Sequence, residues 1–288
     1  MFEFGRELKR LFGAENLNVA RDGLTGGDAS LLELLDLDML RAEAKSADIA
    51  AGRMGAKDRA QRKLEAAIVW REIARRSGDA VALRRAAAGA EAAAELFGRD
   101  RRPDGWARAR CEQAFCAMLG AELFGDEGLN AAAEAAFRDA RSAARGGLAL
   151  PLAEVGIAAI EGRSRMVDGD AQLARVTAAR FSTPIVGLRT LTRRCRAARL
   201  LAVEARLVRA DLLLGWGARL KDRDLLQQAL NEAELAGEGL DQAYEPLSFA
   251  RVAAARGQAM ALLGEIGGQI EPLADAVTAL ADVLNDLS

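Results

Sequence analysis

Two segments of this sequence follow the same plan, and this repetition limits the folds open to the chain more than any other feature. Each segment begins with a proline, at Pro103 and Pro246, and has an aromatic residue three positions later, at Trp106 and Phe249, followed by Ala-Arg. Apolar and small residues then recur at the spacing of an α-helix. A turn and a second stretch with this spacing follow in each copy. The pattern predicts two copies of a helical hairpin, and hence a helical-repeat protein.

The expected bounds of the hairpin helices follow from this spacing. In the first hairpin we expect helices over about residues 106–123 and 129–140, joined by the turn sequence FGDEG. The closing helix of the second hairpin is expected over about residues 270–287. A Leu-Gly at Gly120 and a Leu-Leu-Gly at Gly264 are interpreted as stops of the first helix in each copy, because glycine is a poor helix former.

The hairpins resemble tetratricopeptide repeats in a divergent form. Ala133 and Phe137 match the Ala-x3-Phe element of that family, and Gly257 stands where the family has a glycine. The sequence departs from the pattern in the first copy, where Ala114-Phe115 replaces Leu-Gly, and in the second, where Ala281 replaces the aromatic residue. The resemblance implies a right-handed superhelical solenoid of antiparallel helix pairs, with a concave face that binds peptides. It implies no catalysis.

Composition supports the same fold class. Hydrophobic residues make up 51% of the sequence, many of them alanine, and only five prolines interrupt it. Because alanine is the best helix former, we predict an all-α fold.

Residues 1–27 are expected to form an N-terminal amphipathic arm and linker, and residues 28–288 a helical-repeat domain. Residues 185–216 are expected to form one long helix. The helix pairs should number about five to six, with roughly 40 to 48 residues each. This exceeds the 34-residue period of the resembled family and leaves a HEAT-like or irregular superhelix as an alternative.

The residue types that carry most chemistry are scarce in this chain. It has no histidine, which removes the commonest general base and metal ligand, and its three cysteines form no Cys-x-x-Cys pair. We interpret Cys111, Cys116 and Cys195 as small buried side chains. Acidic pairs such as Asp36 and Asp38 are interpreted as helix starts, where carboxylates stabilise the helix dipole. The sequence predicts no catalytic, cofactor-binding or metal-binding residue, and a protein that is not an enzyme.

A run of arginines is the most pronounced charge feature: Arg189, Arg193, Arg194, Arg196, Arg199, Arg206 and Arg209. Arg189, Arg193 and Arg196 fall on one face of the predicted helix. Because a guanidinium binds a carboxylate through two parallel hydrogen bonds, this row suits an acidic peptide. The alternative is a solvated helix face that pairs with Glu and Asp of neighbouring helices. The net charge of −2 and the lack of aromatic residues among these arginines argue against nucleic acid as a partner.

A second group of candidate residues comes from the resemblance alone. In the resembled family the first helix of each pair lines the concave face. The polar residues on the first helices of the two hairpins are therefore expected to line the groove: Arg108, Arg110, Gln113, Arg251 and Arg256.

The first residues of the chain form a separate candidate. Residues 2–12 are expected to form a short amphipathic helix, with basic residues away from its apolar side. The apolar side carries Phe2, Phe4, Leu8, Leu11 and Phe12. This helix is interpreted either as a cap on the first repeat or as an arm that docks onto a partner or a membrane surface.

Together these observations predict a scaffold or adaptor that holds a peptide or helix of another protein in a concave groove. Two alternatives are a regulatory protein whose superhelix responds to a bound peptide, and a peripheral membrane adaptor that attaches through residues 2–12. Homo-oligomerisation is a further alternative.

The sequence lacks an apolar run of about 18 residues, so we expect no transmembrane helix and a cytoplasmic location. Its preference for arginine over lysine is typical of a bacterial genome rich in G and C.

Overall fold

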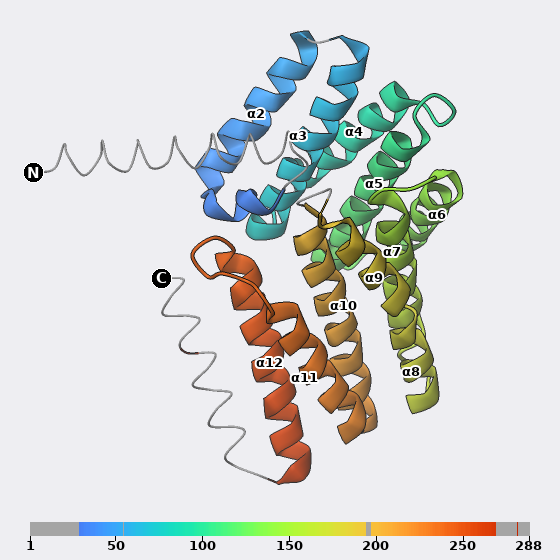
Figure 1. Ribbon diagram of the computed structural model, residues 1–288, viewed down its shortest axis with the longest axis vertical. Coiled ribbons are helices and arrows are strands. Elements are labelled where there is room, and N and C mark those ends of the chain that lie inside the picture. The colour runs from blue at the N-terminus through green and yellow to red at the C-terminus, as the bar shows by residue number, and fades with distance from the viewer. Residues whose placement is uncertain (1–28, 54, 194–196, 269–280, 282–288) are drawn as a thin grey trace, which may run out of the picture. The chain divides into compact units, whose positions relative to one another are not determined.

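The protein is described by a computed structural model that places residues 29–53, 55–193, 197–268 and 281 (Figure 1). Within these ranges every regular element is a helix and none is a strand. The prediction of an all-α fold is therefore confirmed. No helix in the same ranges has both the length and the apolar character that crossing a membrane requires.

The helices are joined by short connections. In chain order they are η1 (Ala29–Leu34), α2 (Leu37–Arg53), α3 (Ala56–Ser77), α4 (Ala80–Phe97), α5 (Pro103–Phe124), α6 (Gly128–Ala143), α7 (Ala149–Ser164), α8 (Ala171–Ala179), α9 (Ser182–Leu191), α10 (Ala197–Leu220), α11 (Arg223–Gly237) and α12 (Pro246–Gly267).

The contacts gather the chain into two compact units, and each is described here by itself. Unit 1 comprises residues 1–157 and 195–197, and unit 2 comprises residues 158–194 and 198–288. The predicted boundary between residues 27 and 28 lies outside the described residues, and the single repeat domain over 28–288 stays a prediction.

Unit 1 is built from helices that pack in consecutive pairs. Helix α2 packs against α3, α3 against α4, α4 against α5 and α5 against α6, and α3 also contacts α5. Helix α3 begins at residue 56, α5 at 103 and α7 at 149, so the pairs repeat after 47 and then 46 residues. This agrees with the predicted period and exceeds the 34 residues of tetratricopeptide repeats. The right-handed superhelix that the resemblance implies stays a prediction.

The turn between α3 and α4 shows how local sequence forms these hairpins. Gly78 has a positive φ of 68° and its amide donates to the Ala74 carbonyl, which ends α3 in the left-handed conformation that favours glycine. Asp79 follows at once and caps α4, because its side chain accepts hydrogen bonds from the amides of Val81 and Ala82. Two residues therefore suffice to reverse the chain.

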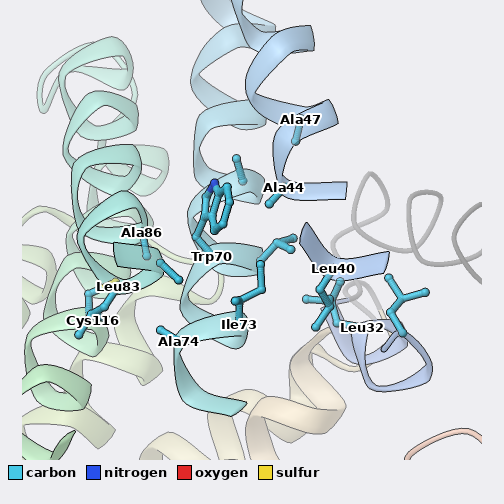
Figure 2. Packing of buried hydrophobic residues seen from close by; sticks show 14 residues of the cluster. Leu32, Leu40, Ala44, Ala47, Trp70, Ile73, Ala74, Leu83, Ala86 and Cys116 are labelled. Carbon is cyan, nitrogen blue, oxygen red and sulfur yellow. The ribbon is translucent and has the colours of Figure 1, made fainter. Parts of the chain in front are cut away.

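The main core of unit 1 lies where α2, α3 and α4 meet (Figure 2). Leu40 and Ile73 are fully buried there, among alanines whose small side chains let the helices approach closely. Trp70 fills the same cluster, and its indole Nε1 donates to the Asp48 carboxylate over 3.0 Å. The one polar atom of this large ring thus keeps a hydrogen-bond partner.

The first predicted hairpin corresponds to α5 and α6, with Pro103 in the first turn of α5. The prediction that Gly120 stops this helix is wrong, because α5 continues to Phe124 and ends at Gly125, whose φ is 68°. Gly120 instead permits a close approach of the two helices. A Cβ added there would lie 2.9 Å from Cδ1 of Leu129 on α6. Likewise α12 passes through Gly264 and ends at Gly268.

Unit 2 has its core among α8, α10, α11 and α12. Trp216 of α10 and Leu226 of α11 are almost fully buried in it. The second predicted hairpin begins as expected, with Pro246 in the first turn of α12. Its closing helix, predicted over residues 270–287, lies outside the described residues apart from position 281.

The long helix predicted over residues 185–216 is instead two helices, because α9 ends at Leu191 and α10 begins at Ala197. Two threonines at the end of α9 bond back to the helix. Thr190 Oγ1 donates to the Gly187 carbonyl and Thr192 Oγ1 to the Arg189 carbonyl, each over 2.8 Å. Such bonds compete with continued helix formation and favour a stop.

Candidate protein-interaction surface

Helix α9 has one buried face and one face in solvent. Pro184, Ile185 and Leu188 are buried, whereas Val186 and Arg189 are exposed. This separation follows from the helical period, which places residues three or four positions apart on the same side. The buried face fixes the position of the exposed one, so the polar side chains of α9 stand on a rigid element.

The exposed face of α9 borders a hollow of about 440 Å³. The described residues that line it are Val186, Arg189, Thr190 and Arg193, and we call this surface the α9 hollow. It combines an aliphatic side chain, a hydroxyl and two guanidiniums. Such a mixture offers one apolar contact together with donors that can orient an anionic group.

The two arginines of the α9 hollow carry positive charge without a counterion close by. Arg189 and Arg193 are both exposed, and neither guanidinium pairs with a carboxylate among the described residues. Arg196, which was predicted to share their face, lies outside the described residues. The structure therefore brings together two of the three arginines of the predicted row.

The arginines that follow in the same run have internal partners. Arg206 and Arg209 both bind the largely buried Glu232 carboxylate, over 2.8 and 3.1 Å. Arg199 pairs with Glu245 and also donates to the Gly239 carbonyl. These three arginines thus form the pairs with acidic residues that the alternative predicts, but Arg206 and Arg209 are largely buried and do not form a solvated face.

The groove candidates of unit 1 also have internal partners. Arg108 pairs with Glu112 over 3.3 Å, one turn along α5. Arg110 donates to the Asp139 carboxylate over 2.7 Å and to the Gln113 amide oxygen over 2.6 Å. The contact with Asp139 joins α5 to α6, and both guanidiniums are partly shielded from solvent.

The groove candidates of unit 2 divide into one paired and one exposed residue. Arg251 of α12 pairs with Glu204 of α10. Arg256 is exposed, and no ion pair is formed by its guanidinium with any of the residues that the structure places. Among all the groove candidates that are described, the unpaired guanidiniums are thus those of Arg189, Arg193 and Arg256.

A buried carboxylate that sequence reasoning missed lies at the centre of unit 1. Glu112 is fully buried and binds Arg71 of α3 as well as Arg108. Burial by itself would raise the pKa of the Glu112 carboxyl, but the two guanidiniums outweigh burial and lower that pKa below its usual value. Arg71 also lies over the Phe115 ring, 5.4 Å from its centroid. The carboxylate and both guanidiniums pair with one another inside the unit, so the cluster joins α3 to α5.

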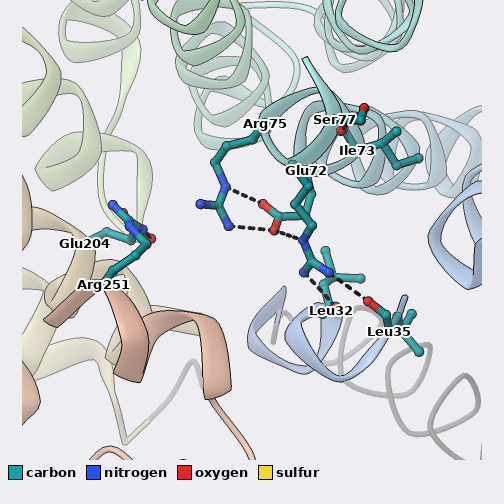
Figure 3. A network of polar contacts seen from close by, with 9 residues as sticks. Leu32, Leu35, Glu72, Ile73, Arg75, Ser77, Glu204 and Arg251 are labelled. Carbon is teal, nitrogen blue, oxygen red and sulfur yellow. Dashed lines mark hydrogen bonds and ion pairs between the residues drawn. The ribbon is translucent and has the colours of Figure 1, made fainter. Parts of the chain in front are cut away.

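A second network fastens η1 to α3 (Figure 3). Glu72 accepts from Arg75 over 2.7 Å and from Arg76 over 2.6 Å. Arg76 in turn donates to the carbonyls of Leu35 and Leu32, over 2.7 and 3.0 Å. Burial opposes the charge of Glu72, but the two guanidiniums outweigh it and lower its pKa. The network satisfies carbonyls at the end of η1, which is a structural task.

The cysteines offer no reactive thiol in the described part of the chain. Cys111 and Cys116 are buried, as predicted, and neither forms a disulfide. Burial raises the pKa of the Cys111 thiol to about 12 and also raises that of Cys116. Both thiols are therefore protonated at neutral pH and poor nucleophiles. Cys195 lies outside the described residues, and no cluster of metal-binding side chains occurs within them.

The predicted docking arm, with Phe2, Phe4, Leu8, Leu11 and Phe12, also lies outside the described residues. The fold and the α9 hollow define an all-α protein of helices packed in consecutive pairs, with an exposed basic surface on one of them. Comparisons of the chain with known protein families, with curated proteins and with solved structures found no match.

Proposed function

We propose that this protein is a non-catalytic interaction scaffold that binds an acidic segment of another protein at the α9 hollow. One observation carries the proposal. Within one run of arginines, Arg199, Arg206 and Arg209 are engaged by internal acceptors, whereas Arg189 and Arg193 stand exposed beside a hollow. A folded chain that pairs most of a charged run and leaves two neighbours unpaired has donors available for an external anion.

The geometry of the α9 hollow favours a carboxylate-bearing segment with an apolar side chain beside it. Each guanidinium presents a planar fork that matches a carboxylate, and Arg keeps its charge at all physiological pH values. Val186 supplies an apolar contact next to these forks. Because both arginines are exposed, their attraction should act mainly on the association rate and should weaken as salt is added.

We further propose that the helix pairs continue as a right-handed superhelical solenoid of the tetratricopeptide type, in which the first helices of the pairs line the groove. The contact between α3 and α5, the first helices of successive pairs, supports this arrangement in unit 1. The exposed Arg256 lies on α12, the first helix of the second predicted hairpin, and would line such a groove. A cytoplasmic location is part of the same proposal.

Binding of a defined probe tests the function. The probe is a short fluorescent peptide that alternates Glu with Leu, and the control peptide has Gln in place of Glu. We expect the full-length protein to raise the anisotropy of the Glu peptide only, and R189E/R193E to weaken this binding by about tenfold.

A matched variant separates local charge from net charge. R163E/R165E changes the net charge equally at two exposed arginines near the end of α7, neither of which is among the residues that line the α9 hollow. It should bind the Glu peptide as the wild type does. Equal losses in both variants, or equal binding of the Glu and Gln peptides, would contradict the proposal.

A further inference from the structure

The structure points to a particular occupant of the α9 hollow, and the inference rests on the function proposed above. We infer that the hollow of one molecule receives the α5–α6 turn of a second copy of this chain. We call this turn, residues 122–127, the hairpin tip. The contact would join unit 2 of one molecule to unit 1 of another.

The hairpin tip exposes apolar side chains where a chain reversal places them in solvent. Leu123 and Phe124 are 38% and 51% exposed, at the last turn of α5. Gly125 then reverses the chain with a φ of 68°, and Asp126 accepts a hydrogen bond from the Gly128 amide at the start of α6. The tip is therefore a defined turn between two packed helices, and its exposed ring is held by a rigid hairpin.

Acidic side chains frame this apolar pair. Glu122, Asp126 and Glu127 are all exposed, and none of them pairs with a cation among the residues that the structure places. Elsewhere in unit 1 acidic residues often have basic partners, as Asp139 has Arg110 and Glu134 has Arg138. The tip thus carries three uncompensated negative charges around two exposed apolar side chains.

Two other helix ends of the described chain lack this combination, whereas the α11–α12 connection comes nearer to it, with Tyr244 59% exposed and Asp241 exposed three positions before it. The α3–α4 turn exposes Val81 beside a single acid, Asp79. The end of α12 exposes Ile266 with a single neighbouring acid, Glu265. The hairpin tip differs from them in that two adjacent exposed apolar side chains, Leu123 and Phe124, lie among three exposed acidic residues.

The hairpin tip and the α9 hollow are complementary in charge and in character. The hollow offers two unpaired guanidiniums beside Val186, and its volume of about 440 Å³ falls in the range of sites that take small ligands. It therefore has room for one aromatic side chain such as Phe124. The carboxylates around that ring would meet Arg189 and Arg193, so the apolar and the charged contacts can form together.

This contact is heterologous, because the two surfaces that meet are different. Copies joined in this way form a closed ring or an open chain, depending on the rotation between them. The surfaces are small, so the association should be weak, with a Kd on the order of 0.1 mM. It should weaken further as salt screens the charges.

Charge reversal on either surface gives a test that a misfolded variant cannot imitate. R189E/R193E reverses the hollow, and E122K/E127K reverses the tip while it keeps the cap made by Asp126. In sedimentation velocity we expect the full-length wild type to associate as its concentration rises and each variant alone to stay monomeric. A mixture of the two should associate again, because the unchanged tip of one fits the unchanged hollow of the other.

Two control variants carry the same charge changes elsewhere. R163E/R165E matches the hollow variant, and E91K/E95K matches the tip variant on the exposed side of α4. Both should associate as the wild type does. F124A should weaken association about tenfold or more without a change in charge.

The outcomes separate this inference from the proposed function. A wild type that stays monomeric, or a mixture that does not regain association, overturns the inference. If the Glu peptide still binds in an Arg189- and Arg193-dependent manner, the proposed function survives that result. If the peptide does not bind and the wild type associates equally well as R189E/R193E, both proposals fall.

Discussion

At the scale of single residues, the strongest constraint in unit 1 is the buried charge of Glu112. It lies on α5 between Arg71 of α3 and Arg108 of its own helix, and it is fully buried. Taking a charge out of water is costly, and two guanidiniums compensate for that cost here. Removal of the carboxylate would leave these guanidiniums partly buried without a counterion.

We therefore expect Glu112→Gln to lower the free energy of unfolding by about 3 kcal/mol, because it breaks a buried ion pair while it keeps the side-chain shape. Urea denaturation followed by circular dichroism measures the change. Glu134→Gln is the control, since it removes a more exposed pair with Arg138 and should cost less than about 1 kcal/mol. Similar losses in the two variants would contradict the role given to burial.

The pH dependence of that loss has a definite sign. The pKa of Glu112 is lowered in the folded protein. Ionised Glu112 therefore contributes to stability at pH values above the unfolded pKa of about 4.3, and this contribution is lost as pH falls through the folded pKa. The difference in stability between wild type and Glu112→Gln should therefore be constant near neutral pH and shrink below about pH 4. Melting temperatures across this range measure it, and a constant difference down to strong acid would refute the assignment.

Glu65 should behave in the opposite way. Burial raises the pKa of this carboxyl, and the nearby Glu43 acts in the same direction, against bonds from Gln61 and Arg62. Because this pKa is raised, the contribution of Glu65 to stability is greatest at pH values below its pKa in the unfolded chain and is lost as pH rises through its pKa in the folded protein. Glu65→Gln, which is always neutral, should therefore melt at a higher temperature than the wild type at neutral pH. The gain should vanish on acidification, and a gain that persists in acid would count against this explanation.

At the scale of helices, the packing of α6 against α7 depends on a glycine. Gly156 lies buried in α7, and a Cβ added there would overlap the Phe137 ring of α6. Gly52 lies in α2 with open space around it. Both glycines lie in helices, but only Gly156 has a close neighbour. Comparing alanine at the two positions therefore distinguishes the helix propensity of alanine from the steric cost of the added methyl group.

We expect Gly156→Ala to destabilise the protein by about 2 kcal/mol, because the cost of overpacking exceeds the helix preference gained. Gly52→Ala should instead stabilise it by roughly 0.5 to 1 kcal/mol. Chemical denaturation of both variants measures the two values. A stabilised Gly156→Ala protein would show that α6 and α7 are not in close contact.

At the scale of the whole molecule, each unit has buried cores of its own. Ile73 lies in the core formed by α2, α3 and α4, and Leu226 in the core formed by α8, α10, α11 and α12. Proteins of this architecture open locally before they unfold completely, in units that correspond to packed motifs.

Truncation of one core should therefore loosen its own unit first. Leu226→Ala removes a fully buried side chain and should cost about 2 to 5 kcal/mol in unit 2. Native-state hydrogen exchange should show the largest loss of protection in α10 and α11, with a smaller loss in α3 and α4. Ile73→Ala should give the reverse pattern. Uniform loss in both variants would mean that the chain unfolds as a single cooperative body.

The sequence by itself determined the features that depend on neighbours along the chain. Helical periodicity, Pro103 and Pro246 at helix starts, and the Gly78-Asp79 turn are set by backbone conformations that a few adjacent residues control. The long repeat period followed from the same local patterns, and the burial of Cys111 from the general preference of free cysteine for buried positions.

Tertiary structure alone decided which charges are used internally and which stay free. Arg193 and Arg206 look alike in the sequence, yet Arg206 reaches Glu232, 26 residues away, and Arg193 borders a hollow. Periodicity places a side chain on a face of its helix but does not tell what lies opposite. The same reason explains why Gly120, predicted as a helix stop, proved to be the point where Leu129 of the next helix comes close.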